Sequence, residues 1–190
     1  MTGQAEVMTE LSTDLIVTAP ADAVWDVIGR RFDRIGDWAT AIPASTALPA
    51  PRTDPKPAAA NPLPVAATAV NAPVAGRVCQ TGMRLVPEVT ETLIAYDDAN
   101  RTLTYEASGM PSFVTVARNT WTVSSIDEHR TQVSLKARFD TRGLLGLLGR
   151  WAILVQVGRT SRHLAEDLRH YVETGTPSPR KQQRLRRAGR

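Results

Sequence analysis

The sequence is poor in cysteine and lacks the segments that direct a chain across a membrane. Its only cysteine among 190 residues is Cys79, so no internal disulfide can form and a disulfide-stapled secreted domain is excluded. The N-terminal segment carries Glu6, Glu10 and Asp14 and has no cationic region followed by an apolar run, which is unlike a signal peptide. We therefore expect a reducing, cytoplasmic compartment.

Long hydrophobic runs are missing as well. The most apolar stretch covers residues 143–158, and Arg150 and Gln156 interrupt it. A membrane-spanning helix needs about 20 apolar residues. The stretch predicts a helix that faces a core, and we expect no transmembrane segment.

Acidic residues are absent from the last 15 positions, 176–190, which hold six of the 23 basic residues. The remainder has 17 basic and 19 acidic residues, a formal charge of −2. A basic fold that grips DNA is disfavoured, because its surface would need a cationic stripe. Any weak polyanion contact, with RNA or an anionic surface, is expected in the tail Arg180–Arg190, which we predict to be disordered.

Sequence motifs of common catalytic centres are also lacking. There is no G-x-S-x-G, no glycine loop for phosphate and no Cys/His spacing for a metal. Neighbouring residues do not assemble a nucleophile with a base. The sequence therefore predicts neither a metal nor another cofactor.

Periodicity predicts strands and helices in a definite order. A strand over residues 11–18 precedes two short helices, 20–29 and 32–40, and the last strand alternates, with Val133, Leu135, Ala137 and Phe139 on one face. The expected antiparallel strands after Gly76 include residues 89–96, 103–108, 112–126 and 131–139. Apolar residues then recur at helical spacing over 143–173. The pattern predicts an α+β domain whose long helix lies against the concave side of a curved sheet.

One segment does not fit a folded element. Residues 50–75 contain nine alanines and six prolines, a composition typical of an extended insertion. We therefore expect a single domain over 1–175, with a flexible insertion at 50–75, followed by the tail at 176–190.

Three segments carry a resemblance to a known superfamily: LIVTAPADAVWDVI, ETLIAYDDANRTLTYEASGMP and GRTSRHLAEDLRHYVE. Over roughly residues 10–174 the chain resembles the START/Bet v 1-like (SRPBCC) superfamily, and within it the bacterial polyketide cyclase/dehydrase and lipid-transport group. The resemblance implies the helix-grip fold, in which an antiparallel sheet wraps around a long C-terminal helix. It also implies an internal cavity for an apolar small molecule.

Alternation predicts which side chains line such a cavity. One face of the strand over 113–123 carries Phe113, Thr115, Ala117, Asn119, Trp121 and Val123. On this face Asn119 is suited to orient a ligand carbonyl or hydroxyl, although it can equally bond a neighbouring backbone group. Met110 and Phe113 lie near the turn 108–113, which resembles the mouth of the family's cavity. Further expected lining residues on the helix are Leu147, Trp151 and Leu154; a core without a pocket uses such residues equally well.

Two further residues are weak candidates for chemistry. An inward Glu91 is a candidate proton donor or base, but pairing with Arg77, Arg84 or Arg118 would make it structural. Tyr105 is a candidate hydrogen-bond donor or an ordinary packing residue. Our leading hypothesis is a binding or transport protein for a hydrophobic small molecule. The alternatives are a cyclase/dehydratase-type enzyme that uses Glu91, Tyr105 and Asn119, and an interaction module that works through the tail.

Overall fold

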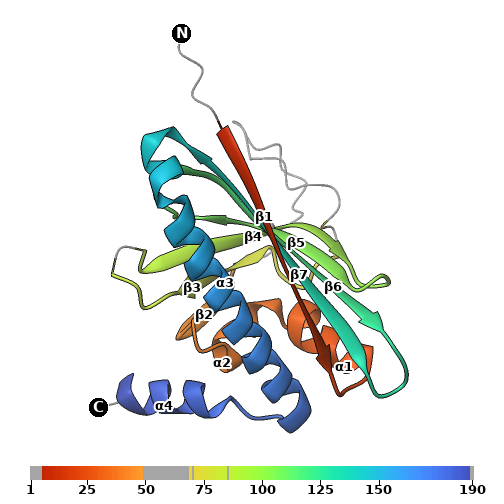
Figure 1. Ribbon diagram of the computed structural model, residues 1–190. Helices are drawn as coiled ribbons and strands as arrows, with labels where there is room; N and C mark the ends of the chain where they lie inside the picture. Colours follow the sequence, from red (N-terminus) through yellow and green to blue (C-terminus); the bar gives the residue numbers. More distant parts are fainter. Residues whose placement is uncertain (1–5, 49–68, 70, 85, 189–190) are drawn as a thin grey trace, which may run out of the picture.

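Seven antiparallel strands form one curved sheet, and a long helix runs along its inner side (Figure 1). The computed structural model describes residues 6–48, 69, 71–84 and 86–188, and for residues 6, 7, 142–157 and 188 it describes the backbone alone. The strands are β1 (Glu6–Val17), β2 (Ala44–Leu48), β3 (Gly76–Gln80), β4 (Glu88–Asp97), β5 (Thr102–Ser108), β6 (Val114–Ser125) and β7 (Thr131–Arg142). Their order across the sheet is β1-β7-β6-β5-β4-β3-β2. The predicted helix-grip architecture is confirmed.

Short helices between the first two strands close one end of the sheet (Figure 1). The helices are α1 (Ala21–Trp25), the π-helix η1 (Asp26–Arg30), the 3-10 helix η2 (Phe32–Arg34), α2 (Ile35–Trp38), α3 (Gly143–Thr174) and α4 (Pro179–Ala188). The two predicted short helices correspond to α1 with η1 and to η2 with α2. Within η1, Gly29 is required by packing, because a Cβ at this position would lie 2.5 Å from the Trp25 ring.

The predicted hairpin turns have the local bonding that their sequences suggest. In the β4–β5 turn, Asp97 accepts hydrogen bonds from the backbone N–H and the side-chain amide of Asn100, at 2.9 and 2.7 Å. In the β6–β7 turn, Asp127 accepts one from the backbone N–H of His129 at 3.0 Å. Such Asx-type bonds fix the turns without tertiary help.

The connection between α2 and β3 differs from the prediction. Strand β2 was not anticipated; its five residues, ASTAL, are too few and too small to show a clear period, and the strand pairs with β3 alone at the edge of the sheet. Most of the predicted insertion 50–75 lies outside the described residues. Close to its end, Ala72 and Val74 pack against the core.

The C-terminal tail also differs. Residues 179–188 form helix α4, so the prediction of a disordered tail at 176–190 is wrong for them. The physical reason lies in two side chains: Lys181 is buried, and the Ser178 hydroxyl accepts a hydrogen bond from the backbone N–H of Lys181, as a helix N-cap does. Residues 189 and 190 lie outside the described residues.

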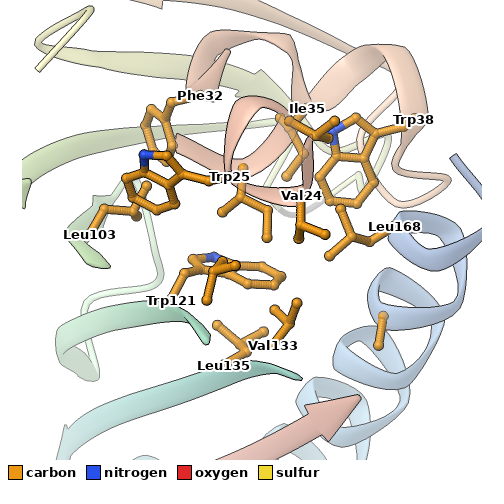
Figure 2. Packing of buried hydrophobic residues seen from close by; sticks show 14 of the residues in the cluster. Val24, Trp25, Phe32, Ile35, Trp38, Leu103, Trp121, Val133, Leu135 and Leu168 are labelled. Carbon is orange, nitrogen blue, oxygen red and sulfur yellow. The ribbon is translucent and has the colours of Figure 1, made fainter. Parts of the chain in front are cut away.

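The main core lies where α1, α2 and the second half of α3 meet the sheet. Figure 2 shows Val24, Trp38 and Leu168 gathered over Trp121 and Leu135. We call this group the large cluster. Aromatic and branched side chains fill it, as in the close-packed interior of a globular domain.

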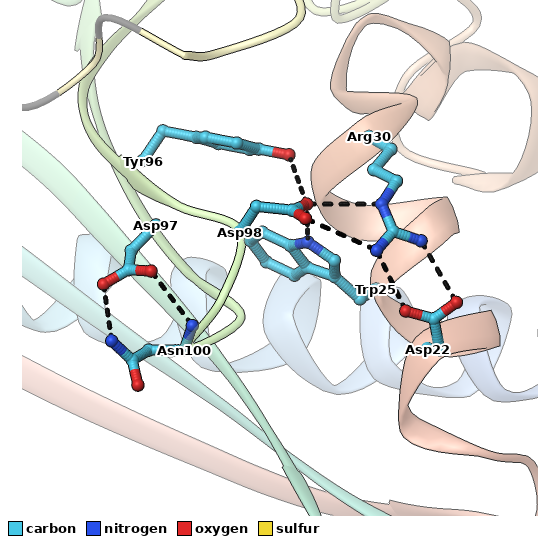
Figure 3. A network of polar contacts seen from close by, with 7 residues as sticks. All are labelled: Asp22, Trp25, Arg30, Tyr96, Asp97, Asp98 and Asn100. Carbon is cyan, nitrogen blue, oxygen red and sulfur yellow. Dashed lines mark hydrogen bonds and ion pairs between the residues drawn. The ribbon is translucent and has the colours of Figure 1, made fainter.

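A polar network ties the β4–β5 hairpin to α1 (Figure 3). One oxygen of Asp98 accepts hydrogen bonds from the Trp25 indole at 2.7 Å, the Tyr96 hydroxyl at 3.1 Å and the Arg30 guanidinium at 3.2 Å. Arg30 in turn pairs with Asp22 at 2.9 Å. The Trp25 and Asp98 bonds join two of the segments on which the superfamily resemblance rests, and their role here is structural.

Candidate functional site

Beyond the large cluster, three alanines lie on neighbouring strands of the inner face of the sheet. Ala107 on β5, Ala117 on β6 and Ala137 on β7 belong to a second, separate apolar cluster. Its other members are Leu11, Met110, Val114 and Phe139. We call this group the alanine cluster. Ala117 and Ala137 are 2% and 3% exposed.

Two members of the alanine cluster are shorter than the large-cluster side chains on the same face of the same strands. On β7 the inward position after Leu135 holds Ala137, and on β6 Ala117 lies two inward positions from Trp121, with Asn119 between them. An alanine side chain ends at Cβ, so it covers little of the distance of about 10 Å that separates packed layers. At Ala117 and Ala137 the inner face of the sheet is therefore covered less deeply by its own side chains than at Trp121 and Leu135.

Two polar side chains lie at the boundary between the clusters. Tyr105 on β5 and Asn119 on β6 are direct cross-strand partners. Asn119 is half-buried, and its amide has no hydrogen-bond partner in the part of the chain that the structure describes. Such an amide can both donate to and accept from a ligand.

Tyr105 is buried, and burial together with the negative charge of Glu91 raises the pKa of its hydroxyl. The positive charge of Arg77 and a hydrogen bond with the Trp121 indole oppose this rise only in part. The phenol is therefore neutral at physiological pH and acts as a hydrogen-bonding group, not as a base.

A buried charge pair lies beside Tyr105. Arg77 on β3 and Glu91 on β4 are cross-strand partners, and the Nε of Arg77 donates to Oε2 of Glu91 at 2.5 Å. The side chain of Glu91 is 13% exposed. Burial by itself would lower the pKa of Arg77, but the interactions with Glu91, Tyr105 and Cys79 together more than offset it and raise the pKa, so the guanidinium stays protonated.

The guanidinium of Arg77 is held on two further sides. Its Nη1 donates to the Phe32 carbonyl at 2.5 Å, and its central carbon lies 3.8 Å from the centre of the Phe32 ring and 5.3 Å from that of Tyr105. The Cys79 sulfur lies 3.8 Å from Glu91. Burial, with a further contribution from Glu91, raises the pKa of the Cys79 thiol to about 12, so this cysteine is unsuited to act as a nucleophile. We call Phe32, Arg77, Cys79, Glu91 and Tyr105 the Arg77 group.

The structure thus brings together some of the predicted site residues. Glu91 and Tyr105 belong to the Arg77 group, and Asn119 faces Tyr105. Glu91 has the pairing with Arg77 that the sequence left open, whereas Arg118 pairs with Glu106. The sequence indicated Arg77 only as a partner of Glu91, and nothing in it places the guanidinium against the rings of Phe32 and Tyr105. That placement depends on η2, whose contact with β3 has no local signal.

The predicted lining residues have different locations. Met110 packs in the alanine cluster, and Trp121 packs in the large cluster. Phe113 is half-buried and is not among the residues packed in the alanine cluster, because the β6–β7 register shifts between Val114 and Val116 and turns Val114 inward. The side chains of Leu147, Trp151 and Leu154 lie outside the described residues.

The cations of the tail are only partly available to a partner. Arg180 pairs with Glu166, Lys181 is buried, and Arg184 donates to the Thr40 carbonyl at 2.9 Å. Arg186 and Arg187 are exposed. The tail therefore offers fewer free charges than its sequence suggests.

The described residues contain no group of three or more His, Cys, Asp or Glu side chains placed to hold a metal ion. No helix within the described ranges combines the length and apolar character that crossing a membrane requires.

Comparison with known proteins agrees with this geometry. A family model described as "Polyketide cyclase / dehydrase and lipid transport" matches residues 8–173. No curated protein matches the sequence.

Solved structures share the fold at low sequence identity. The Zhui aromatase/cyclase from Streptomyces sp. R1128 is 18% identical with a TM-score of 0.62, and the alignment covers 88% of this chain and 94% of that one. A START superfamily protein from Mycobacterium smegmatis is 14% identical with a TM-score of 0.59, covering 88% and 99%. Norcoclaurine synthase from Thalictrum flavum is 13% identical with a TM-score of 0.59, covering 88% and 96%.

Proposed function

Because the chain belongs to the polyketide cyclase/dehydrase and lipid-transport family, we propose that it binds a hydrophobic small molecule between its sheet and α3. The ligand class is a lipid, a polyketide or an isoprenoid-like compound. The observation that carries the proposal is the alanine cluster, since Ala107, Ala117 and Ala137 occupy three neighbouring strands on the inner face. Asn119 supplies the amide that orients a carbonyl or hydroxyl of the ligand. The single buried cysteine supports a cytoplasmic location.

The proposal is tested by filling the space. Ala137→Leu adds three carbon atoms at the alanine cluster, and Ala44→Leu adds the same atoms at an exposed position of β2. Binding of a dansyl-labelled undecanoic acid is measured by fluorescence, after circular dichroism has confirmed that both variants fold. We expect Ala137→Leu to weaken binding about tenfold or more, because overpacking costs about 1–3 kcal/mol.

The control Ala44→Leu is expected to bind as the wild type does. Equal affinity in Ala137→Leu and the wild type would show that the probe binds elsewhere. Native mass spectrometry of protein purified from its own host then identifies the natural ligand by its mass.

A second function, cyclase/dehydratase-type catalysis, is supported by the Arg77 group. A buried guanidinium on the ligand side of a sheet can stabilise the negative charge of an enolate oxygen. In this reading Glu91 exchanges a proton with the ligand when the ligand displaces it from Arg77, and Tyr105 donates a hydrogen bond. Cyclisation, followed by release of water, would need no group beyond these side chains.

Glu91→Gln separates catalysis from binding. It keeps a hydrogen-bond acceptor beside Arg77 but cannot take up a proton. We expect turnover of a short linear poly-β-ketone to be lost while probe binding remains. Glu106→Gln is the matched control, because Glu106 makes the corresponding pair with Arg118 with about half of each side chain exposed. Full turnover in Glu91→Gln would rule out this catalytic role.

A weak polyanion contact through α4 would depend on Arg186 and Arg187, which carry exposed charge. The test is heparin affinity at stated salt, because such binding weakens steeply as salt rises. An Arg186→Ala, Arg187→Ala double variant with unchanged heparin retention would remove this role.

A further inference from the structure

Helix α4 lies beyond residues 8–173, which the family model matches, yet it is held to the domain by a buried lysine. Lys181 is 1% exposed. Its ammonium donates to three backbone carbonyls, those of Ala39 at 3.1 Å, Ile42 at 2.7 Å and Pro43 at 3.3 Å. All three acceptors belong to the segment that follows α2, and Figure 1 shows α4 beside α2.

The ammonium of Lys181 is fully used by this arrangement. It has three N–H donors, each with a carbonyl acceptor, and among the described residues no carboxylate forms an ion pair with it. A buried charge is tolerated only when its hydrogen bonds are satisfied, so the carbonyls and the lysine require each other.

A second set of contacts joins α4 to the same segment. Asp167 on α3 accepts from the Ser178 hydroxyl at 2.5 Å with one oxygen, and from the backbone N–H of Thr40 at 2.7 Å with the other. Arg184 also donates to the Thr40 carbonyl. The segment 39–43 is thus fixed by α4 and α3 together.

This segment follows directly on residues 32–38, and Phe32 among them belongs to the Arg77 group. Through Ser45, whose hydroxyl donates to the Asp33 carbonyl at 2.5 Å and accepts from the Gly36 N–H at 2.9 Å, residues 32–45 form one hydrogen-bonded unit. At the start of the unit the Phe32 carbonyl accepts from Arg77, and in its second half three backbone carbonyls accept from Lys181.

We infer that α4 holds one side of the ligand site in position. Lys181 is the positioning residue, because it fixes residues 32–43 and, through them, the Phe32 carbonyl that accepts from Arg77. The link to a ligand rests on the proposed function, whereas the effect of Lys181 on residues 32–43 does not. When the contacts of α4 are lost, residues 32–43 become more mobile.

The test measures amide hydrogen exchange in the ligand-free protein. In Lys181→Ala we expect the peptides that cover residues 32–43 to exchange about 10 to 100 times faster, since hydrogen bonds to a charged group are lost. Gln183→Ala is the matched control on the same helix, because Gln183 is exposed. It is expected to leave exchange at residues 32–43 unchanged.

Chemical rescue separates the ammonium bonds from mere space filling. Lys181→Ala removes the atoms of n-propylammonium, so we expect millimolar n-propylammonium to slow exchange at residues 32–43 again. 1-Propanol has nearly the same size but no charge, and we expect no rescue by it. Equal rescue by both compounds, or rescue by neither, would overturn the role given to the ammonium.

Probe binding completes the experiment. In Lys181→Ala we expect the dansyl probe to dissociate at least about tenfold faster than in the wild type. If the wild type binds no probe, the proposed function fails, while hydrogen exchange still tests whether Lys181 fixes residues 32–43. Unchanged exchange at residues 32–43, or a change confined to α4, would overturn the inference. Should Lys181→Ala not fold, Ser178→Ala, which removes the cap and the bond to Asp167, is measured in the same way.

Discussion

Removing the carboxylate of Asp98 should destabilise the fold by leaving a buried indole N–H without its acceptor. Trp25 is fully buried, and its Nε1 lies 2.7 Å from Asp98 (Figure 3). Leaving such a donor unsatisfied costs about 1–3 kcal/mol. The Arg30 pair contributes little, because both side chains are more than a third exposed and Arg30 keeps Asp22 as a partner.

We therefore expect Asp98→Ala to lower the free energy of unfolding by about 2 kcal/mol. For a domain of this size the corresponding fall in Tm is about 4–8 °C. The assay is urea unfolding followed by tryptophan fluorescence, with thermal unfolding by circular dichroism as a second measurement. Asp97→Ala is the matched control; Asp97 bonds only within its own exposed turn, so its loss should cost less than about 1 kcal/mol.

A double-mutant cycle with Trp25→Phe isolates the bond itself. Phe keeps most of the buried ring but has no N–H, so the carboxylate should matter less in this background. We expect a coupling energy of about 1–2 kcal/mol between Asp98 and Trp25. A coupling near zero, or equal losses for Asp98→Ala and Asp97→Ala, would refute the reasoning.

Three further predictions use the core, the thiol and pH. Leu168→Ala should cost about 3 kcal/mol in urea unfolding, because Leu168 is fully buried in the large cluster, whereas Leu185→Ala on α4, where the side chain is 47% exposed, should cost under about 0.5 kcal/mol. Cys79 should resist a disulfide reagent at mildly alkaline pH and react once guanidinium unfolds the chain, because burial raises its pKa to about 12; rapid reaction of the native protein would contradict its position. Hydrogen bonds from Trp25 and Arg30 lower the pKa of Asp98, so its contribution to stability is present above the ordinary carboxyl pKa of about 3.9 and is lost as pH falls through the lower folded value. The difference in urea midpoint between the wild type and Asp98→Asn should therefore shrink below about pH 4, and a constant difference would argue against this titration.

Local patterns in the sequence were sufficient for every strand but β2, for the turns and for α3. In β7 the alternation that placed Val133, Leu135, Ala137 and Phe139 inward is confirmed, since all four are buried. The turn at Asp97 uses bonds to a residue three positions away. These features depend on neighbours within a few residues, so they are determined by the sequence directly.

The register of the sheet had to come from the tertiary structure. Regular alternation predicted Thr115 inward, but the irregularity between Val114 and Val116 turns Val114 toward the core, and the Thr115 hydroxyl donates to the Asp140 carbonyl. A bulge is a property of two strands and leaves no period in either. Likewise, three arginines were possible partners of Glu91, and only the β3–β4 register selects Arg77.

The basic tail shows the same division most clearly. The sequence by itself determined that residues 176–190 are cationic and free of acid. Whether they are disordered or folded depended on three carbonyls that lie about 140 positions away in the chain and accept from Lys181. A buried ammonium is stable only where such acceptors converge, and only the tertiary structure brings them together.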